Sequence, residues 1–221
     1  MLISLCIPVH NRTYDLKVTM PYLLAAAEAS PLVEIVIVDY NSPDDLIPYI
    51  AGLNNKAISY VPYIGRNHYH MAHARNLSVK AAQGEYVVIM SADIYPVNNF
   101  VQVVREMLEG GYVWMHGRLY TGAIVCQRQE FLDAGGYDER FEFYGPEDKD
   151  LHDRLARRGG KFRMLPNGLL SVIETPNEEK IKNYRLPLSK REMHRRGMII
   201  YKENKAAGLL VANEGLTWGV L

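Results

Sequence analysis

Two adjacent acids, Glu147 and Asp148, have the residue types and the spacing that acid–base chemistry needs. They follow Gly145-Pro146 and open a pattern typical of a helix that runs to about residue 158. Acids in a first helical turn are common because they complement the helix dipole, so the pair also has a purely structural explanation. In transfer to a hydroxyl group, however, one carboxylate takes the proton and its neighbour holds the acceptor. Tyr144 supplies an aromatic ring just before them.

A second group of polar residues follows three apolar runs of the N-terminal half. His10 and Arg12 come after the first run, Asp39 after the second, and Ser91 and Asp93 after the fourth. A single Asp at a strand end is more often a turn or capping residue. Because ligands of open α/β sheets bind beyond the carboxyl ends of the strands, three such clusters favour a common binding site.

The chemistry of these residues fits a nucleotide diphosphate. The carboxylate of Asp39 can accept from a base N–H, and the guanidinium of Arg12 can reach a diphosphate. Asp93 can hold a hard divalent cation that neutralises phosphates. Neither a Walker A sequence nor G-x-G-x-x-G follows the first apolar run, which disfavours kinase-like and dinucleotide-dependent chemistry.

The elements that must position these residues alternate along the chain, which predicts an α/β fold. Short runs typical of buried strands lie at 2–9, 33–38, 58–61, 86–90, 112–116, 122–127, 162–165 and 169–173. Helical spacing of apolar residues lies at 16–27, 71–81, 98–109, 129–134 and 147–158. The first four strands are expected to be parallel, and a mixed sheet edge is expected after residue 96.

Composition is that of an ordinary globular domain. The 25 Lys and Arg balance 25 Asp and Glu, which excludes a globally basic nucleic-acid binder. Residues 1–9 lack the basic lead-in of a signal peptide, and no apolar run approaches the roughly 20 residues that span a bilayer, so a cytoplasmic protein is expected. Cys6 and Cys126 lie in apolar runs and are predicted to be reduced core residues, without a disulfide framework or a Cys-based zinc site.

Two further features have competing explanations. His68, His70 and His73 are close in sequence, but their spacing does not place all three on one helix face, so we expect loop residues near the ligand, with His73 on a helix surface. The stretch 180–205 carries nine Lys or Arg and two Glu. It is either a solvated helix face or a phosphate-facing lid that brings the arginines of 191–196 over the site.

The motifs of both halves resemble those of known glycosyltransferases. The segments IPVHNR at 7–12, EIVIVD at 34–39, ARN at 74–76, GEY at 84–86 and SAD at 91–93 look like the nucleotide half of GT-A glycosyltransferases of the family 2 type. The segments FL at 131–132, GGY at 135–137, YGPEDKDL at 144–151 and RL at 154–155 are similar to the acceptor half of the animal β-1,4-galactosyltransferases. This resemblance covers about residues 1–175.

The resemblance implies a GT-A fold with a mostly parallel, Rossmann-like sheet flanked by helices. It implies a catalytic domain at 1–177, with a nucleotide-binding half at 1–96 and an acceptor half at 97–177. A basic appendage or lid would follow at 178–221.

The resemblance also implies roles for single residues. The general base would be Asp148, and Glu147 and Tyr144 would bind the acceptor. The residues lining the nucleotide would be Pro8, His10, Arg12, Asp39, Arg75 and Ser91, with Asp39 on the uracil.

A divalent cation, Mn²⁺ or Mg²⁺, is implied as the cofactor. Asp93 would be its ligand at the D-x-D position of the family, and Glu174 is the nearest candidate for the family's late histidine ligand. Ser91 stands at the first acidic position of that motif. This departure implies that the metal is bound more weakly or is not required.

The leading hypothesis is an inverting, UDP-sugar-dependent transferase that acts by direct displacement with Asp148 as base. One alternative is a catalytically silent sugar-nucleotide or glycan-binding module, prompted by Ser91 and the missing histidine. The other is a nucleotidyltransferase, which needs a Gly-rich basic loop that residues 9–12 do not supply. The acceptor stays open among a glycan precursor, a lipid-linked sugar, a protein and a modified base in DNA.

Overall fold

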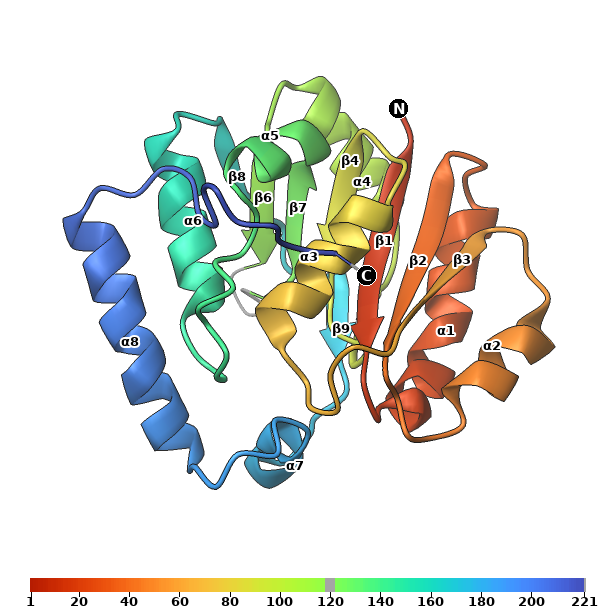
Figure 1. The fold of residues 1–221 in the computed structure, drawn as a ribbon. Helices are drawn as coiled ribbons and strands as arrows, with labels where there is room; N and C mark the ends of the chain where they lie inside the picture. Colours follow the sequence, from red (N-terminus) through yellow and green to blue (C-terminus); the bar gives the residue numbers. More distant parts are fainter. Residues whose placement is uncertain (118–121, 221) are drawn as a thin grey trace.

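A seven-stranded sheet runs through the centre of the molecule (Figure 1). The computed structural model describes residues 1–117 and 122–220. In chain order the strands of this sheet are β1 (Ile3–Val9), β2 (Val33–Tyr40), β3 (Ile58–Tyr63), β4 (Tyr86–Ile89), β6 (Trp114–Gly117), β7 (Ile124–Gln127) and β8 (Phe162–Leu165). Their spatial order is β3-β2-β1-β4-β7-β6-β8. A smaller antiparallel sheet pairs β5 (Ile94–Pro96) with β9 (Leu170–Val172).

The sheet is parallel in its N-terminal half and mixed beyond it. Strand β1 pairs in parallel with β2 and β4, and β2 with β3. Every residue of β1 is buried, as expected for a strand covered on both faces. Strand β7 is antiparallel to both β4 and β6, and β8 is parallel to β6. The predicted α/β class and the mixed edge are confirmed.

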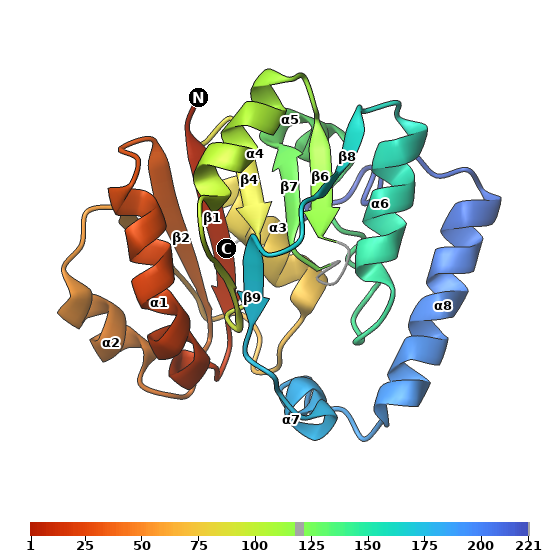
Figure 2. The ribbon, with the colours of Figure 1, turned by 180° about the vertical axis from the view of Figure 1, so that it is seen from behind.

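Helices cover both faces of the sheet. They are α1 (Thr13–Glu28), α2 (Leu46–Leu53), α3 (Met71–Ala81), α4 (Phe100–Glu109), α5 (Arg128–Asp133), α6 (Glu147–Arg157), α7 (Asn177–Lys182) and α8 (Lys190–Ala206). Helices α3 and α5 lie on the face toward the viewer in Figure 1, and α1 and α4 lie on the face seen in Figure 2. Cys6 and Cys126 are free and fully buried in the hydrophobic cluster that includes α3 and α5, which confirms their place in the core.

Three elements are absent from the sequence-based prediction: α2, β5 and the six-residue helix α7. Helix α2 has a single buried residue, Leu46, and the sequence LIPYIAGL carries no polar face that marks a helix. Strand β5 spans only three residues, and it forms because β9, about 75 residues later, pairs with it. The predicted division at residues 96 and 177 stays a prediction, and residues 118–121 and Leu221 lie outside the described residues.

The basic helix α8 packs along α6 by one buried face (Figure 1). That face consists of Met193, Gly197, Tyr201 and Asn204. A Cβ at Gly197 would lie 2.7 Å from Cδ of Pro146, so glycine permits the close approach of α8 to the loop before α6. The charged residues of α8 lie mainly on its other faces.

The chain after α8 returns across the outer side of α3 and α5 (Figure 1). The backbone N–H of Ala212 donates to the carbonyl of Ala134, and the amide of Asn213 donates to the carbonyls of Gly135 and Tyr137. The backbone N–H of Gly219 donates to the carboxylate of Glu139. This C-terminal segment therefore fixes residues 134–139, which precede the acid pair.

Replacing Gly135 with Ala is expected to destabilise the fold by about 1–3 kcal/mol or more. Gly135 has a φ of +73°, and a Cβ there would lie 1.9 Å from the carbonyl oxygen of Ala212. Gly168→Ala is the matched control, because Gly168 has a φ of +81° and no atom within 4 Å of the added Cβ. Urea unfolding of both variants measures the difference, and equal losses would contradict the contact with Ala212.

Candidate active site

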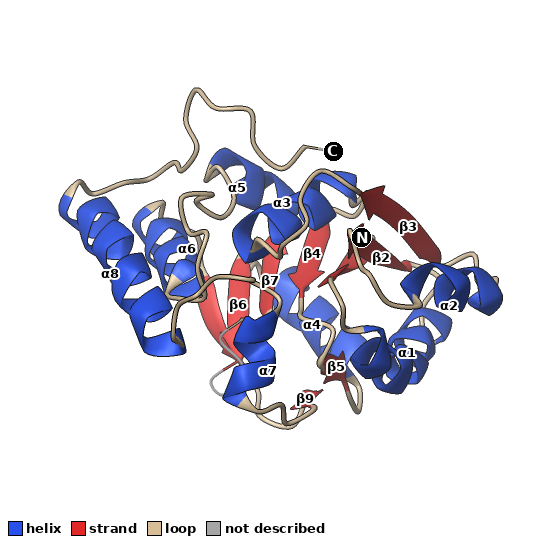
Figure 3. Cartoon of the chain, turned by 60° about the horizontal axis from the view of Figure 1, so that its bottom comes forward, coloured by secondary structure: helices blue, strands red, loops and turns tan. Residues whose placement is uncertain are grey.

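A cavity of about 480 Å³ opens at the carboxyl ends of β1 and β4. Figure 3 brings these strand ends forward and shows α7 in front of them. Its lining comes from segments far apart in the sequence, from Pro8 to His194. Of the residues that the sequence indicates, those lining it are Pro8, His10, Arg12, Arg75, Ser91, Asp93, Tyr144, Glu147 and Asp148.

His10 offers an unpartnered acceptor to this cavity. Its Nδ1 lies 2.6 Å from the carbonyl oxygen of Tyr40, and because a carbonyl only accepts, Nδ1 carries the proton. Burial lowers the pKa of His10, so the ring is neutral at pH 7. Its Nε2 is buried and has no partner among the described residues. The ring lies nearly parallel to that of Tyr69, another lining residue, at 5.9 Å. Nε2 is therefore a buried acceptor whose lone pair is unused among the described residues.

Arg12 is held rigidly at the edge of the cavity. Its Nε lies 2.6 Å from Asp15, and its Nη2 lies 3.5 Å from Asp93 and 3.1 Å from the hydroxyl of Thr175. These three partners come from α1, from the end of β4 and from the segment after β9. A guanidinium held in this way is preorganised to bind a phosphate, because binding would cost little further side-chain entropy.

Asp93 is the acid that the cavity offers to a cation. Mg²⁺ in nucleotide sites commonly takes one or two carboxylates and completes its shell with phosphate oxygens and water, so Asp93 with the Ser91 hydroxyl fits a cation shared with a diphosphate. Glu174 is exposed and is not among the lining residues. Within residues 1–117 and 122–220, no three His, Cys, Asp or Glu side chains form a group that could hold a metal by themselves.

The acid pair is organised by one buried arginine. Arg75 is only 3% exposed, and its Nη1 lies 2.6 Å from Oδ1 of Asp148 and 3.4 Å from Oε1 of Glu147. The hydroxyl of Tyr137 donates to the same Oδ1 at 3.1 Å, and the Tyr137 ring lies under the guanidinium. Oδ2 of Asp148 faces Gly122, where a Cβ would come within 3.2 Å of it. Oδ1 is thus fixed by the protein, whereas no residue within 1–117 and 122–220 forms a hydrogen bond with Oδ2.

Glu147 differs from its neighbour in environment. Burial and the charge of Asp148 raise the pKa of Glu147 to about 8, and Arg75 opposes that rise. Its Oε2 accepts from the backbone N–H of Gly145 at 3.2 Å. At neutral pH Glu147 is therefore mostly protonated.

Two residues predicted for the site lie apart from the cavity lining. Both oxygens of Asp39 have partners, because Oδ1 accepts from the N–H of Ser42 at 2.8 Å and Oδ2 from the hydroxyl of Tyr60 at 2.6 Å. Glu174, which is exposed, is the second predicted residue outside the cavity lining. Arg75 does line the cavity, but its guanidinium contacts the acids, whereas the resemblance placed it at the nucleotide.

The histidines of the 68–73 segment have separate structural partners. His70 caps α3 by accepting from the N–H of His73, and its Nε2 lies 3.0 Å from the carbonyl of Glu139. Nδ1 of His73 lies 2.8 Å from the hydroxyl of Tyr40. The expectation that His73 lies on a helix surface is wrong, because the side chain is buried under Tyr40, Tyr63 and the C-terminal segment.

The C-terminal region contributes lining residues that differ from those expected. Asn183 and His194 line the cavity. The amide of Asn183 donates to the carbonyl of His10 at 2.9 Å, and its own backbone carbonyl accepts from the N–H of Tyr69. Arg195 and Arg196 instead pair with Glu192 on the exposed side of α8, and like Arg191 they are not among the lining residues. No local sequence signal marks Asn183.

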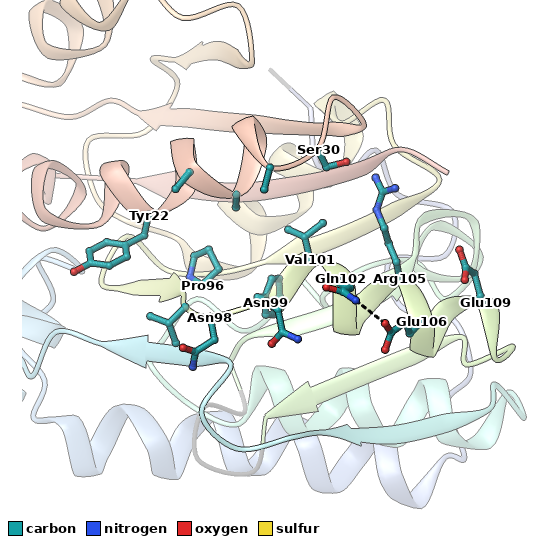
Figure 4. A pocket seen from close by; sticks show the side chains of 15 residues that line it. Tyr22, Ser30, Pro96, Asn98, Asn99, Val101, Gln102, Arg105, Glu106 and Glu109 are labelled. Atoms are coloured by element: carbon teal, nitrogen blue, oxygen red, sulfur yellow. Dashed lines mark hydrogen bonds between the residues drawn. The ribbon is translucent and has the colours of Figure 1, made fainter.

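A second cavity, of about 660 Å³, lies between α1 and α4 (Figure 4). On the α1 side it is lined by Tyr22, Ala25 and Ala26, and by Ala29 directly after the helix. The polar side chains around it do not converge, and Gln102 and Glu106 bond to each other at 3.0 Å. We assign the chemistry to the smaller cavity because charged groups from several elements meet there.

The sheet topology, the polar strand ends and the acid pair at the start of α6 define a GT-A type of site. The chain belongs to glycosyl transferase family 2, whose model matches residues 4–148.

The curated relatives are longer than this chain. Bovine β-1,4-galactosyltransferase 1 is 24% identical, in an alignment that covers 74% of this chain and 41% of the relative. Chondroitin synthase of Pasteurella multocida is 22% identical, in an alignment that covers 80% of this chain and 25% of the relative. The chain thus spans about two fifths of the length of the galactosyltransferase and one quarter of the length of the chondroitin synthase.

Solved structures share the fold at low identity. TarS of S. aureus, residues 1–349, aligns with a TM-score of 0.68 and 14% identity over 87% of this chain and 68% of that chain. The mannosyltransferase PcManGT from Pyrobaculum calidifontis, in complex with GDP-Man and Mn²⁺, aligns with a TM-score of 0.65 and 16% identity over 78% of this chain and 57% of that chain. Among the helices of the described residues, none has the length and apolarity to cross a membrane.

Proposed function

We propose that this protein transfers a sugar from a UDP-sugar to an acceptor hydroxyl, with inversion at the anomeric carbon and Asp148 as general base. One observation carries the proposal: Asp148 lines the same cavity as His10, Arg12 and Asp93, whose chemistry suits a nucleotide diphosphate. Family membership supports it, and so does the solved complex of the related fold of TarS with UDP-GlcNAc.

The donor occupies the end of the cavity formed by β1 and β4. Nε2 of His10 accepts from a ribose hydroxyl or a uracil N–H, and Arg12 binds the diphosphate. Asp93 and Ser91 would hold a divalent cation, which supplies positive charge to the leaving diphosphate. Asp39 reaches the uracil only if one of its oxygens accepts a further hydrogen bond, besides those from Ser42 and Tyr60.

The acceptor occupies the end formed by the loop before α6. Its hydroxyl oxygen attacks the anomeric carbon, and the hydroxyl proton passes to Oδ2 of Asp148. The bond between that carbon and the phosphate oxygen breaks, and its electron pair leaves with UDP. Arg75 and Tyr137 position Asp148 by fixing Oδ1, while Glu147 and Tyr144 hold the acceptor.

Binding of a nucleotide-sugar panel tests the donor class. We expect UDP and UDP-sugars to raise the melting temperature more than GDP-, CDP- or ADP-sugars do, because a ligand that binds the native state stabilises it by mass action. Release of UDP from the bound donor then separates a transferase from a silent binding module. Turnover of UTP with a sugar phosphate, without UDP release, would instead support a nucleotidyltransferase.

Replacing Asp93 with Ala is expected to abolish the effect of Mn²⁺ on UDP binding. In the wild type, Mn²⁺ should tighten UDP binding by about tenfold, because the cation joins the carboxylate to the diphosphate. Glu174→Ala is the control, since Glu174 is exposed and outside the cavity lining. Calorimetric titration with and without Mn²⁺ measures both. A metal response that survives in Asp93→Ala, or none in the wild type, would remove the cation from this site.

A further inference from the structure

The segment between β9 and α8 crosses the donor end of the cavity. It includes α7, which lies in front of the strand ends in Figure 3. The segment comes after residues 4–148, the part of the chain that matches the family. We call residues 173–184 the donor strap.

The first part of the donor strap contacts the charged residues of the donor end. The backbone N–H of Ile173 donates to the carbonyl of Asp93 at 2.8 Å. Nη2 of Arg12 donates to the hydroxyl of Thr175 at 3.1 Å, and that hydroxyl donates in turn to the carbonyl of Ile173 at 3.3 Å. The same Nη2 lies 3.5 Å from Asp93. Thr175 therefore helps to fix the direction of the guanidinium that we assign to the diphosphate.

The last part of the donor strap contacts the two loops that carry His10 and Tyr69. The amide of Asn183 donates to the carbonyl of His10 at 2.9 Å and accepts from the amide of Asn11 at 3.1 Å. Its backbone carbonyl accepts from the N–H of Tyr69 at 2.9 Å. Tyr184 is only 1% exposed, and its ring packs edge-on against the Tyr69 ring. Asn183 thus joins the two loops whose rings, those of His10 and Tyr69, lie nearly parallel.

The turn at Asn11 depends on this contact. Asn11 has a φ of +54°, a left-handed conformation that costs free energy for residues other than glycine. Two hydrogen bonds hold the turn: the backbone N–H of Asn11 donates to the hydroxyl of Ser42 at 3.2 Å, and its side chain donates to Asn183. His10 and Arg12 lie on either side of this turn, and both line the cavity. The strap therefore stabilises the conformation that presents both residues to a donor.

We propose that Asn183 and Thr175 are positioning residues for the donor, each for a different part of it. Asn183 raises the affinity for the nucleoside by fixing His10, and Thr175 raises the affinity for the diphosphate by fixing Arg12. Groups that are already held in their bound geometry lose less entropy on binding, so both contacts strengthen donor binding. The inference rests on the proposed function, because it requires a UDP-sugar at this end of the cavity.

NMR titration of uridine and of UDP into the full chain, with Mg²⁺ held constant, tests the proposal. We expect Asn183→Ala to weaken both ligands by the same factor, about three- to tenfold, as the loss of one hydrogen bond of ordinary strength predicts. Thr175→Val should weaken UDP by about threefold and leave uridine unchanged, because only UDP has phosphates. Thr175→Ser keeps the hydroxyl and should bind UDP like the wild type. Glu174→Ala, at an exposed position of the donor strap, should change neither affinity.

The pattern across the two ligands separates positioning from a general loss of stability. Equal losses of uridine and UDP in Thr175→Val, or loss of UDP alone in Asn183→Ala, would overturn the roles assigned to these residues. Wild-type affinities in both variants would overturn the role of the donor strap and leave the transferase. Asn183→Asp keeps the acceptor for Asn11 but loses the donor to His10, so it replaces Asn183→Ala if that variant does not fold. Failure of the wild type to bind UDP would overturn the proposed function itself.

Discussion

Replacing Asp148 with Asn is expected to lower the rate of UDP release from the donor by at least about 100-fold and to leave the affinity for UDP unchanged. The amide keeps the shape of the carboxylate but cannot take the proton of the attacking hydroxyl. Arg75 still faces Glu147 at 3.4 Å in this variant, so the buried guanidinium keeps one of its two acidic partners. Single-turnover release of UDP, measured by chromatography, gives the rate.

The control for this variant is Asp153→Asn. Asp153 lies on the same helix, but it accepts from the hydroxyl of Tyr201 and does not line the cavity. It should release UDP at nearly the wild-type rate. Turnover near the wild-type rate in Asp148→Asn would mean that the base is another group.

Replacing Arg154 with Leu is expected to destabilise the protein by about 3–5 kcal/mol. The side chain is fully buried, with Nε 2.8 Å from Asp150 and its two Nη atoms bonded to the carbonyls of Ala134 and Gly136. Removing the guanidinium leaves a buried carboxylate without its counter-ion and two carbonyls without a donor. The turn that these bonds hold leads into Tyr137, so the loss also loosens a contact of Asp148.

Urea unfolding of Arg154→Leu and Arg157→Leu measures this effect. Arg157, one turn along α6, is 28% exposed and pairs with Asp153 at 3.9 Å, so its loss should cost less than about 1 kcal/mol. Similar losses in the two variants would contradict the role assigned to the buried pair.

The residues at strand ends and at the start of α6 were predictable because each lies directly beside a strong local pattern. Hydrophobic runs place Arg12 and Asp93 at strand ends, and Gly145-Pro146 places Asp148 in a first helical turn. Parallel pairing of β1 with β4 then brings Arg12 and Asp93 together. The sequence therefore indicated nine of the residues that line the cavity, among them Arg12, Asp93 and Asp148.

Contacts between distant segments were not predictable from local patterns. Asn183 bonds to the carbonyl of His10 across 173 positions of sequence. The Ala-Arg-Asn motif predicts a helix, but the contact of Arg75 with Glu147 and Asp148 joins positions more than 70 residues apart. The prediction for the segment that forms α8 considered only its charges. It therefore missed the helical spacing of Met193, Gly197 and Tyr201, which form part of the buried face of that helix.

The anomeric configuration of the first sugar released from an α-linked UDP-sugar tests the central claim most directly. Water can replace the acceptor, so ¹H NMR of donor hydrolysis, recorded before mutarotation, is sufficient. Single displacement assisted by Asp148 predicts UDP together with the β-anomer, and loss of both in Asp148→Asn. Release of the α-anomer, or no cleavage of any donor sugar by protein that binds UDP, would contradict it.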